Sequence, residues 1–218
     1  MTRIRLGTLF CVLALSAVLG ACTTAGASAP PASLSAPASG GASSASCPTS
    51  QPAAMPAGQT RTVTITTALG GITIKVAADL SPIAAGNFVA LAQCGFYDGV
   101  VFHRLVPGFV IQGGDPTGTG TGGPGYTIQD EPVTAKYGRS TVAMARSSDP
   151  NSVGSQFFIV LDDAARDALA SYNTYQIIGM VTAGMETVDA IAATPNSGQP
   201  DNTALKPVAM DRVTVATP

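Results

Sequence analysis

The chain has 218 residues and a nearly balanced charge, with 11 Lys and Arg against 13 Asp and Glu. This length allows one domain with additional segments. The charge is sparse and no basic run occurs, which argues against nucleic acid as a partner. The single histidine has no cysteine near it, so the sequence predicts no zinc-type metal site.

The first 21 residues are typical of an export signal. Arg3 and Arg5 precede an apolar run of about 14 residues, Leu6–Leu19, which is short of the ~20 needed to span a bilayer. The run ends in Leu-Gly-Ala-Cys22, which resembles the lipobox of bacterial lipoproteins, where the peptide is cut before the cysteine and its thiol is lipidated. This predicts an exported protein with a lipid anchor on Cys22 at the outer face of the cell membrane. The alternative is an ordinary secretory signal cut at a small-residue site.

Residues 22–60 are rich in Ser, Ala, Pro and Gly. Such a tract buries too little apolar surface to offset the cost of chain ordering, so it is expected to be a flexible tether. Cys47 lies near its end and Cys94 lies in the following domain. In the oxidising setting that export implies, the two are expected to form a disulfide, and two independent thiols are the alternative.

The remaining residues, 61–218, have the patterns of a folded domain. Apolar residues alternate over 62–67 and 72–76 around Gly70-Gly71, which predicts a β-hairpin. Ser81-Pro82 suits the start of a helix and Gly95 suits the position just after its end. Further short strands are expected at 100–104, 109–112, 141–145, 156–161, 175–181 and 208–215, with a second helix at 185–192. Many short strands with two separate helices predict a mainly β fold, a closed antiparallel barrel with helical ends.

Residues with catalytic chemistry are few. His103 follows Phe102 and is expected to be structural, since no nucleophile-elbow motif accompanies it. The glycine-rich loop 118–125 lacks the Gly-Lys-Ser/Thr ending of a phosphate-binding loop. Asp115 and Glu131 are expected to be solvated or bonded to backbone groups and not to form an acid–base pair.

Three ordered motifs resemble the cyclophilin-type peptidyl-prolyl isomerases over roughly residues 61–215. They are Phe102-His103-Arg104 with FVIQGGD at 109–115 and GTGG at 120–123, then VAMAR at 142–146 with SQFFI at 155–159, and IGMV at 178–181 with Gly184, Met185 and Val188. The resemblance implies a closed eight-stranded antiparallel β-barrel capped by two α-helices, catalysis without a cofactor and a monomer. It also implies that the partners are proline-containing segments of exported proteins, with a folding-chaperone role in addition. The alternative is a binding module of the same fold without turnover.

The resemblance also assigns individual residues. Arg104 matches the catalytic arginine of the family. The expected substrate-binding residues are Phe109, Val110, Gln112, Ala145, Arg146, Ser147, Gln156, Phe158 and Tyr175. Val110 replaces a common Met and Arg146 a common Asn, and the chain has no Trp where the family often has one, near 169–173. Sensitivity to cyclosporin is therefore not implied.

Overall fold

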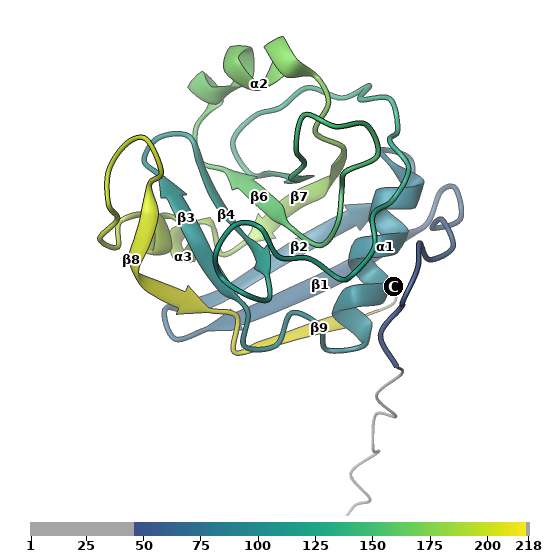
Figure 1. Ribbon diagram of the computed structural model, residues 1–218, viewed down its shortest axis with the longest axis horizontal. Helices are drawn as coiled ribbons and strands as arrows, with labels where there is room; N and C mark the ends of the chain where they lie inside the picture. The colour runs from purple at the N-terminus through teal and green to yellow at the C-terminus, as the bar shows by residue number, and fades with distance from the viewer. Residues whose placement is uncertain (1–45, 217–218) are drawn as a thin grey trace, which may run out of the picture. The chain divides into compact units, whose positions relative to one another are not determined.

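The computed structural model describes residues 46–216, so the predicted signal, Cys22 and most of the predicted tether lie outside the described residues. The described strands form one antiparallel sheet in the order β8-β3-β4-β6-β5-β7-β2-β1-β9 (Figure 1). The strands are β1 Thr60–Thr67, β2 Gly70–Ala77, β3 Val101–Val106, β4 Val110–Asp115, β5 Thr141–Met144, β6 Phe157–Val160, β7 Ile177–Ala183, β8 Thr203–Ala209 and β9 Arg212–Ala216. The expected hairpin is β1–β2.

The sheet is strongly curled but its hydrogen-bonded ladder does not close. The segment expected as one last strand at 208–215 is divided at Met210 and Asp211 into β8 and β9. The Met210 N–H donates to Val100 O over 2.8 Å, and beyond this point the chain leaves β3 and pairs with β1. The two halves thus form opposite ends of the sheet. The prediction of a closed eight-stranded barrel was wrong, because the fold is an open half-barrel of nine strands.

The two expected helices are present as α1, Pro82–Gln93, and α3, Met185–Ala192. A third, α2, spans Arg166–Tyr172 after a short 3-10 turn at Asp163–Ala165, so the expectation of two helices was incomplete. The turn is capped by the Asp162 side chain, which accepts from the Ala164 N–H. Within α2 only Leu169 is buried, so its sequence carries no apolar periodicity that would reveal a helix.

The start of α1 is held by a residue distant in sequence. Ser81 makes no side-chain capping bond, although the sequence favoured it for that role. Instead the Glu131 carboxylate accepts from the N–H groups of Ile83 and Ala84, both over 2.9 Å. A carboxylate at the positive end of a helix is stabilising. Glu131 is therefore bonded to backbone groups, as the sequence indicated.

Apolar residues pack on both faces of the central strands. Along β6, Phe157 and Ile159 join a cluster with Phe88 of α1, whereas Phe158 and Val160 join a second cluster with Leu169 of α2. Successive side chains of a strand point to opposite faces, so each face of the sheet has its own apolar cover. This explains why all four residues of β6 are buried.

Residues 46–59, which the sequence placed in the tether, lie against the domain. Met55 is buried and its N–H donates to Pro82 O over 2.9 Å. Gly86 permits this contact, because a Cβ there would collide with Ala53 O. The segment is also joined to the end of α1 by a disulfide between Cys47 and Cys94. The folded unit therefore begins before residue 61.

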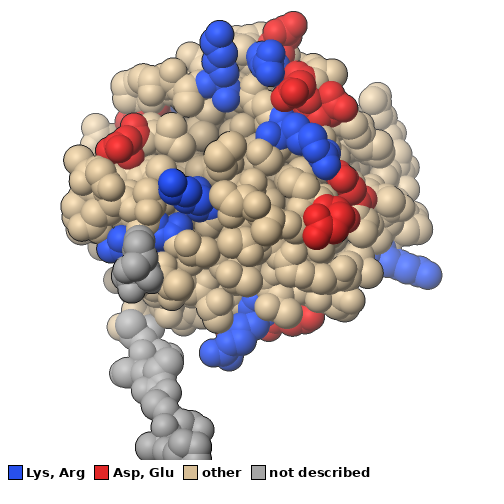
Figure 2. Space-filling model, turned by 180° about the vertical axis from the view of Figure 1, so that it is seen from behind, with Lys and Arg blue, Asp and Glu red and all other residues tan. Residues whose placement is uncertain are grey.

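The surface carries charges of both signs. On the face seen in Figure 2, Lys and Arg lie interspersed with Asp and Glu over the described residues. Within residues 46–216, no helix has the length and apolar character needed to cross a membrane.

Candidate active site

The site is built on a row of residues across three neighbouring strands. Arg104 on β3 pairs with Gln112 on β4, and Gln112 pairs with Phe158 on β6. The register of β3 shifts between Phe102 and Arg104, so His103 is the extra residue of a β-bulge. The bulge brings Arg104 opposite Gln112. The charged and apolar members of the site are therefore aligned by strand pairing.

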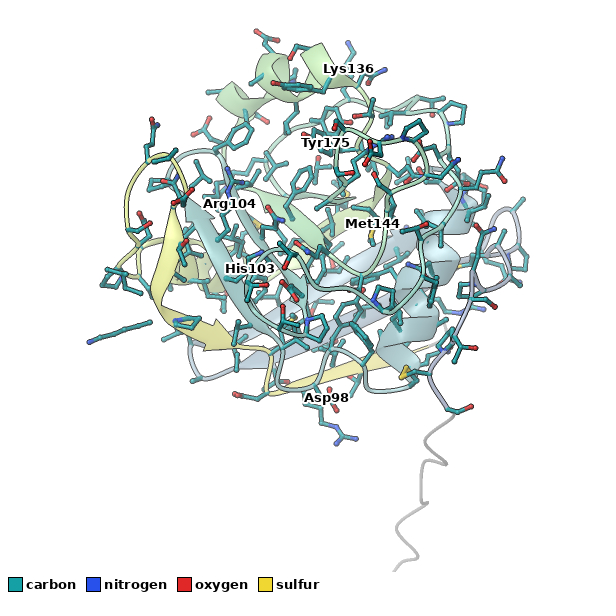
Figure 3. All side chains as sticks on the ribbon, viewed as in Figure 1. Asp98, His103, Arg104, Lys136, Met144 and Tyr175 are labelled. Carbon is teal, nitrogen blue, oxygen red and sulfur yellow. A yellow bond between two sulfur atoms is a disulfide. The ribbon has the colours of Figure 1, made fainter. Side chains whose placement is uncertain are left out.

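A central cavity of about 450 Å³ lies beside this row. Phe158 forms one wall and packs edge-on against Tyr175, with 5.3 Å between ring centroids. The Tyr137 hydroxyl donates to Tyr175 O over 2.9 Å and helps to fix this segment. The cavity is lined by Arg104, Phe109, Val110, Gln112, Ala145, Arg146, Phe158, Ala168, Leu169, Tyr172 and Tyr175. It combines apolar walls with one guanidinium from β3, that of Arg104, which is labelled together with Tyr175 in Figure 3.

A second hollow, here called the loop cavity, measures about 690 Å³ and is lined by Gln112, residues 120–127, residues 145–147 and residues 152–156 without Val153. Gln156 connects its parts. The Gln156 Nε2 donates to Gly120 O and Gly122 O, each over 2.9 Å, and its Oε1 accepts from Gln112 Nε2 over 2.9 Å. Gln112 Oε1 in turn accepts from Arg104 Nη1 over 3.4 Å. A chain of hydrogen bonds thus runs from the glycine-rich loop to Arg104.

The glycine-rich loop wraps around a carboxylate of its own chain. Asp115 is fully buried, and its oxygens accept from the N–H groups of Thr117, Thr119, Gly120 and Gly122 over 2.6 to 3.1 Å. Burial raises the pKa of Asp115, but the hydrogen bonds from Thr117, Gly122 and Gly120 outweigh it and lower the pKa to about 2. The loop therefore does hold an anion, but an internal and structural one.

His103 is buried, with 6% of its surface exposed, and is labelled beside Arg104 in Figure 3. Neither ring nitrogen has a hydrogen-bond partner among the described residues. Burial lowers the pKa of the imidazole and so favours its neutral form, although the Asp115 carboxylate acts in the opposite direction. No group of three or more His, Cys, Asp or Glu residues within 46–216 is placed to hold a metal ion.

Most of the residues assigned from the sequence lie together. Those on the central cavity are Arg104, Phe109, Val110, Gln112, Ala145, Arg146, Phe158 and Tyr175, whereas Ser147 and Gln156 line the loop cavity only. Arg146 lines both cavities and pairs with Asp130, with 2.9 Å between Nη1 and Oδ2.

Three residues of α2, namely Ala168, Leu169 and Tyr172, also line the central cavity and were not assigned from the sequence. Tyr172 is 69% exposed and its ring lies 6.3 Å from that of Tyr175. These residues fall in the stretch 169–173 or beside it, where the motifs give no secure register. The one signal for them in the sequence was Tyr172, a large aromatic residue three positions before Tyr175.

Comparison with known protein families shows to which family the chain belongs. The family model described as "Cyclophilin type peptidyl-prolyl cis-trans isomerase/CLD" matches residues 62–215. The chain belongs to the cyclophilin-type peptidyl-prolyl cis-trans isomerases. It is an enzyme of that class, as several curated relatives are named.

Curated relatives and solved structures agree with this assignment. The cyclophilin domain is 39% identical over 155 residues to peptidyl-prolyl cis-trans isomerase CYP18-2 of Arabidopsis thaliana, covering 69% of this chain and 90% of that protein. It is 35% identical over 176 residues to "Probable peptidyl-prolyl cis-trans isomerase A" of Mycobacterium leprae, covering 72% and 93%. A cyclophilin-type isomerase of Cryptosporidium parvum superposes with a TM-score of 0.64 at 30% identity, covering 73% of this chain and 99% of that one. The same protein has also been crystallised in the presence of the dipeptide Ala-Pro.

Proposed function

We propose that Arg104 accelerates rotation about X–Pro bonds by stabilising the twisted amide while the proline ring occupies the central cavity. The observation that carries the proposal is the position of one guanidinium at the edge of a chamber walled by Phe109, Val110 and Phe158. Among the described residues, the bond to Gln112 is the one hydrogen bond that the Arg104 side chain makes, and at 3.4 Å it is long. The guanidinium thus keeps most of its donors for a substrate.

The chemistry requires no cofactor and no covalent step. The barrier of ~18–20 kcal/mol arises from loss of the partial double bond of the amide. In the twisted state the nitrogen regains its lone pair, so a fixed cationic donor beside it binds that state better than either planar isomer. Arg is suited to this task because its charge is permanent and its donors are rigidly arranged.

The bound segment would cross the site in a defined direction. Residues 145–147 follow β5 and line the route from the central cavity to the loop cavity. We assign them, with Gln112 and Gln156, to the residues that precede proline, and Tyr175 to the far wall of the proline chamber. Arg146 is held by Asp130, so it acts as a wall and its charge is largely neutralised by that carboxylate.

Substitution of Arg104 tests the proposal. Arg104→Ala should remove most of the turnover of a proline peptide while leaving peptide affinity largely intact, because the apolar chamber remains. Arg212→Ala is the matched control, since Arg212 is exposed on β9 and lines neither the central cavity nor the loop cavity. Turnover that survives Arg104→Ala in a folded protein would overturn the assignment.

We further propose that the protein acts at the cell envelope on exported proteins, as a monomer anchored through lipid on Cys22. The signal pattern of residues 1–21 supports export, and the Cys47–Cys94 disulfide suits an oxidising compartment. Incorporation of labelled fatty acid into the wild-type chain, and its loss in Cys22→Ser, is the expected result. An unlabelled wild-type protein in the culture medium would refute the anchor. A folding-chaperone role predicts that the domain also suppresses aggregation of an unfolded client.

A further inference from the structure

A third hollow, here called the side cavity, also adjoins Arg104 and is not lined by residues 145–147. It measures about 520 Å³ and is lined by Arg104 and Gln112, by the loop 118–120, and by His103, Pro200, Asp201 and Thr203. Arg104 and Gln112 line both this cavity and the central one. They therefore form the partition between the two hollows.

The segment before β8 is held firmly beside Arg104. Thr203 is the β-sheet partner of Arg104, and the Leu105 N–H donates to Asn202 O over 2.8 Å. Asp201 immediately precedes this pair and is exposed. Among residues 46–216 its carboxylate has neither an ion pair nor a hydrogen bond, so it is the available anionic group of the side cavity.

His103 provides a second, independent indication of a ligand here. Its imidazole lines the side cavity, is more than nine-tenths buried and has no partner for either nitrogen among the described residues. A buried polar group without a partner is costly, because it has given up its hydrogen bonds to water without replacing them. A donor entering the cavity would supply the missing hydrogen bond.

The direction of the bound segment identifies what enters. If residues before proline follow 145–147, the residue after proline lies on the opposite side of Gln112, next to Arg104. Because the two cavities share Arg104 and Gln112 as lining residues, the residue adjacent to a bound proline is the first that the side cavity can receive. We propose that the side cavity binds the side chain of the residue after proline and that Asp201 selects a basic residue, Lys or Arg, at that position.

Electrostatics disfavours an acidic side chain at the same place. Its carboxylate would be repelled by Asp201 and would compete with the twisted amide for Arg104. A basic side chain pairs with Asp201 and leaves Arg104 free. Ion pairs between exposed groups are weak and screened by salt, so the preference of Lys over Glu in kcat/KM is expected to be about two- to tenfold at low ionic strength.

The test uses the purified full-length protein and the peptides Ala-Ala-Pro-Xaa-Ala, where Xaa is Lys, Ala or Glu. Isomerisation is followed by NMR exchange, which needs no coupling protease. Asp201→Asn should bring the Lys-to-Glu ratio close to one and Asp201→Lys should invert it. Asp211→Lys, a change at an exposed residue that lines none of the three cavities, should leave the ratio unchanged.

The inference rests on the proposed function but fails separately from it. A wild-type ratio near one, or a ratio unaffected by both Asp201 variants, overturns the Asp201 subsite while Arg104-dependent turnover stands. Loss of Arg104 dependence would instead refute the proposed mechanism. Because the chain has one histidine, its imidazole resonances also report directly, and they should shift more with the Lys peptide than with the Ala peptide. Equal shifts would remove His103 from the subsite.

Discussion

Replacing Gln156 with Leu would cut the hydrogen-bond chain between the glycine-rich loop and Arg104 while nearly preserving side-chain volume. Gln156 makes three hydrogen bonds of 2.9 Å, two to Gly120 O and Gly122 O and one to Gln112. A typical hydrogen bond contributes about 0.5–1.5 kcal/mol net to stability. Loss of the two loop bonds is therefore expected to lower the free energy of unfolding by about 1–3 kcal/mol.

The third bond bears on catalysis, because it orients the Gln112 amide whose oxygen accepts from Arg104. A loss of about 1 kcal/mol in the stabilisation of the twisted amide corresponds to roughly a fivefold fall in kcat/KM. The part of the fall that passes through Arg104 should appear in kcat, whereas a rise in KM would report the loss of Gln156 from the loop cavity, which is assigned to the residues before proline.

The assay is NMR exchange on a proline peptide, with urea unfolding measured on the same samples. Gln93→Leu serves as the control, since Gln93 is exposed at the end of α1. A Gln156→Leu protein that is less stable but has wild-type kcat would show that the chain of hydrogen bonds is structural only. Such a result would refute the link to Arg104.

Three further outcomes are expected. In an ordinary helix a Gly→Ala change stabilises by about 1 kcal/mol, but Gly86→Ala should lower the free energy of unfolding in urea by about 1–3 kcal/mol, because the added Cβ displaces Ala53 and uncovers part of Met55. Gly123→Ala is the control, since no atom lies near its Cβ, and a stabilised Gly86→Ala protein would contradict the packing of residues 46–59. The pKa of Asp115 is depressed from 3.8 to about 2, so its carboxylate stabilises the fold above pH 4, and about 2 kcal/mol should be lost as the pH falls through 2, whereas in Asp115→Asn this part of the pH dependence should vanish. The disulfide joins cysteines with a sequence separation of 47, so its reduction should lower the free energy of unfolding, followed by calorimetry, by up to about 4 kcal/mol. An unchanged melting temperature after reduction would contradict a stabilising role of the disulfide.

Local patterns in the sequence were sufficient for the elements that repeat a simple period. Alternating apolar residues marked β1 and β2, and the Ser81-Pro82 start with its helical spacing marked α1. The FHR and FVIQGGD motifs singled out Arg104, Phe109, Val110 and Gln112, all of which line the central cavity. Such signals lie in neighbouring residues or in an ordered series of motifs, so they can be recognised without knowledge of the fold.

The tertiary structure decided what depends on contacts between distant residues. Glu131 rather than Ser81 caps α1, the chain turns at Met210 so that the sheet stays open, and α2 carries Tyr172 to the cavity. None of these follows from periodicity, because each depends on a partner or a surface far away in sequence. The bulge at His103 shows this most clearly. The sequence pointed to Arg104, but only strand pairing placed it opposite Gln112. Arg104 thereby lines both the cavity proposed for the proline and the cavity proposed for the residue after it.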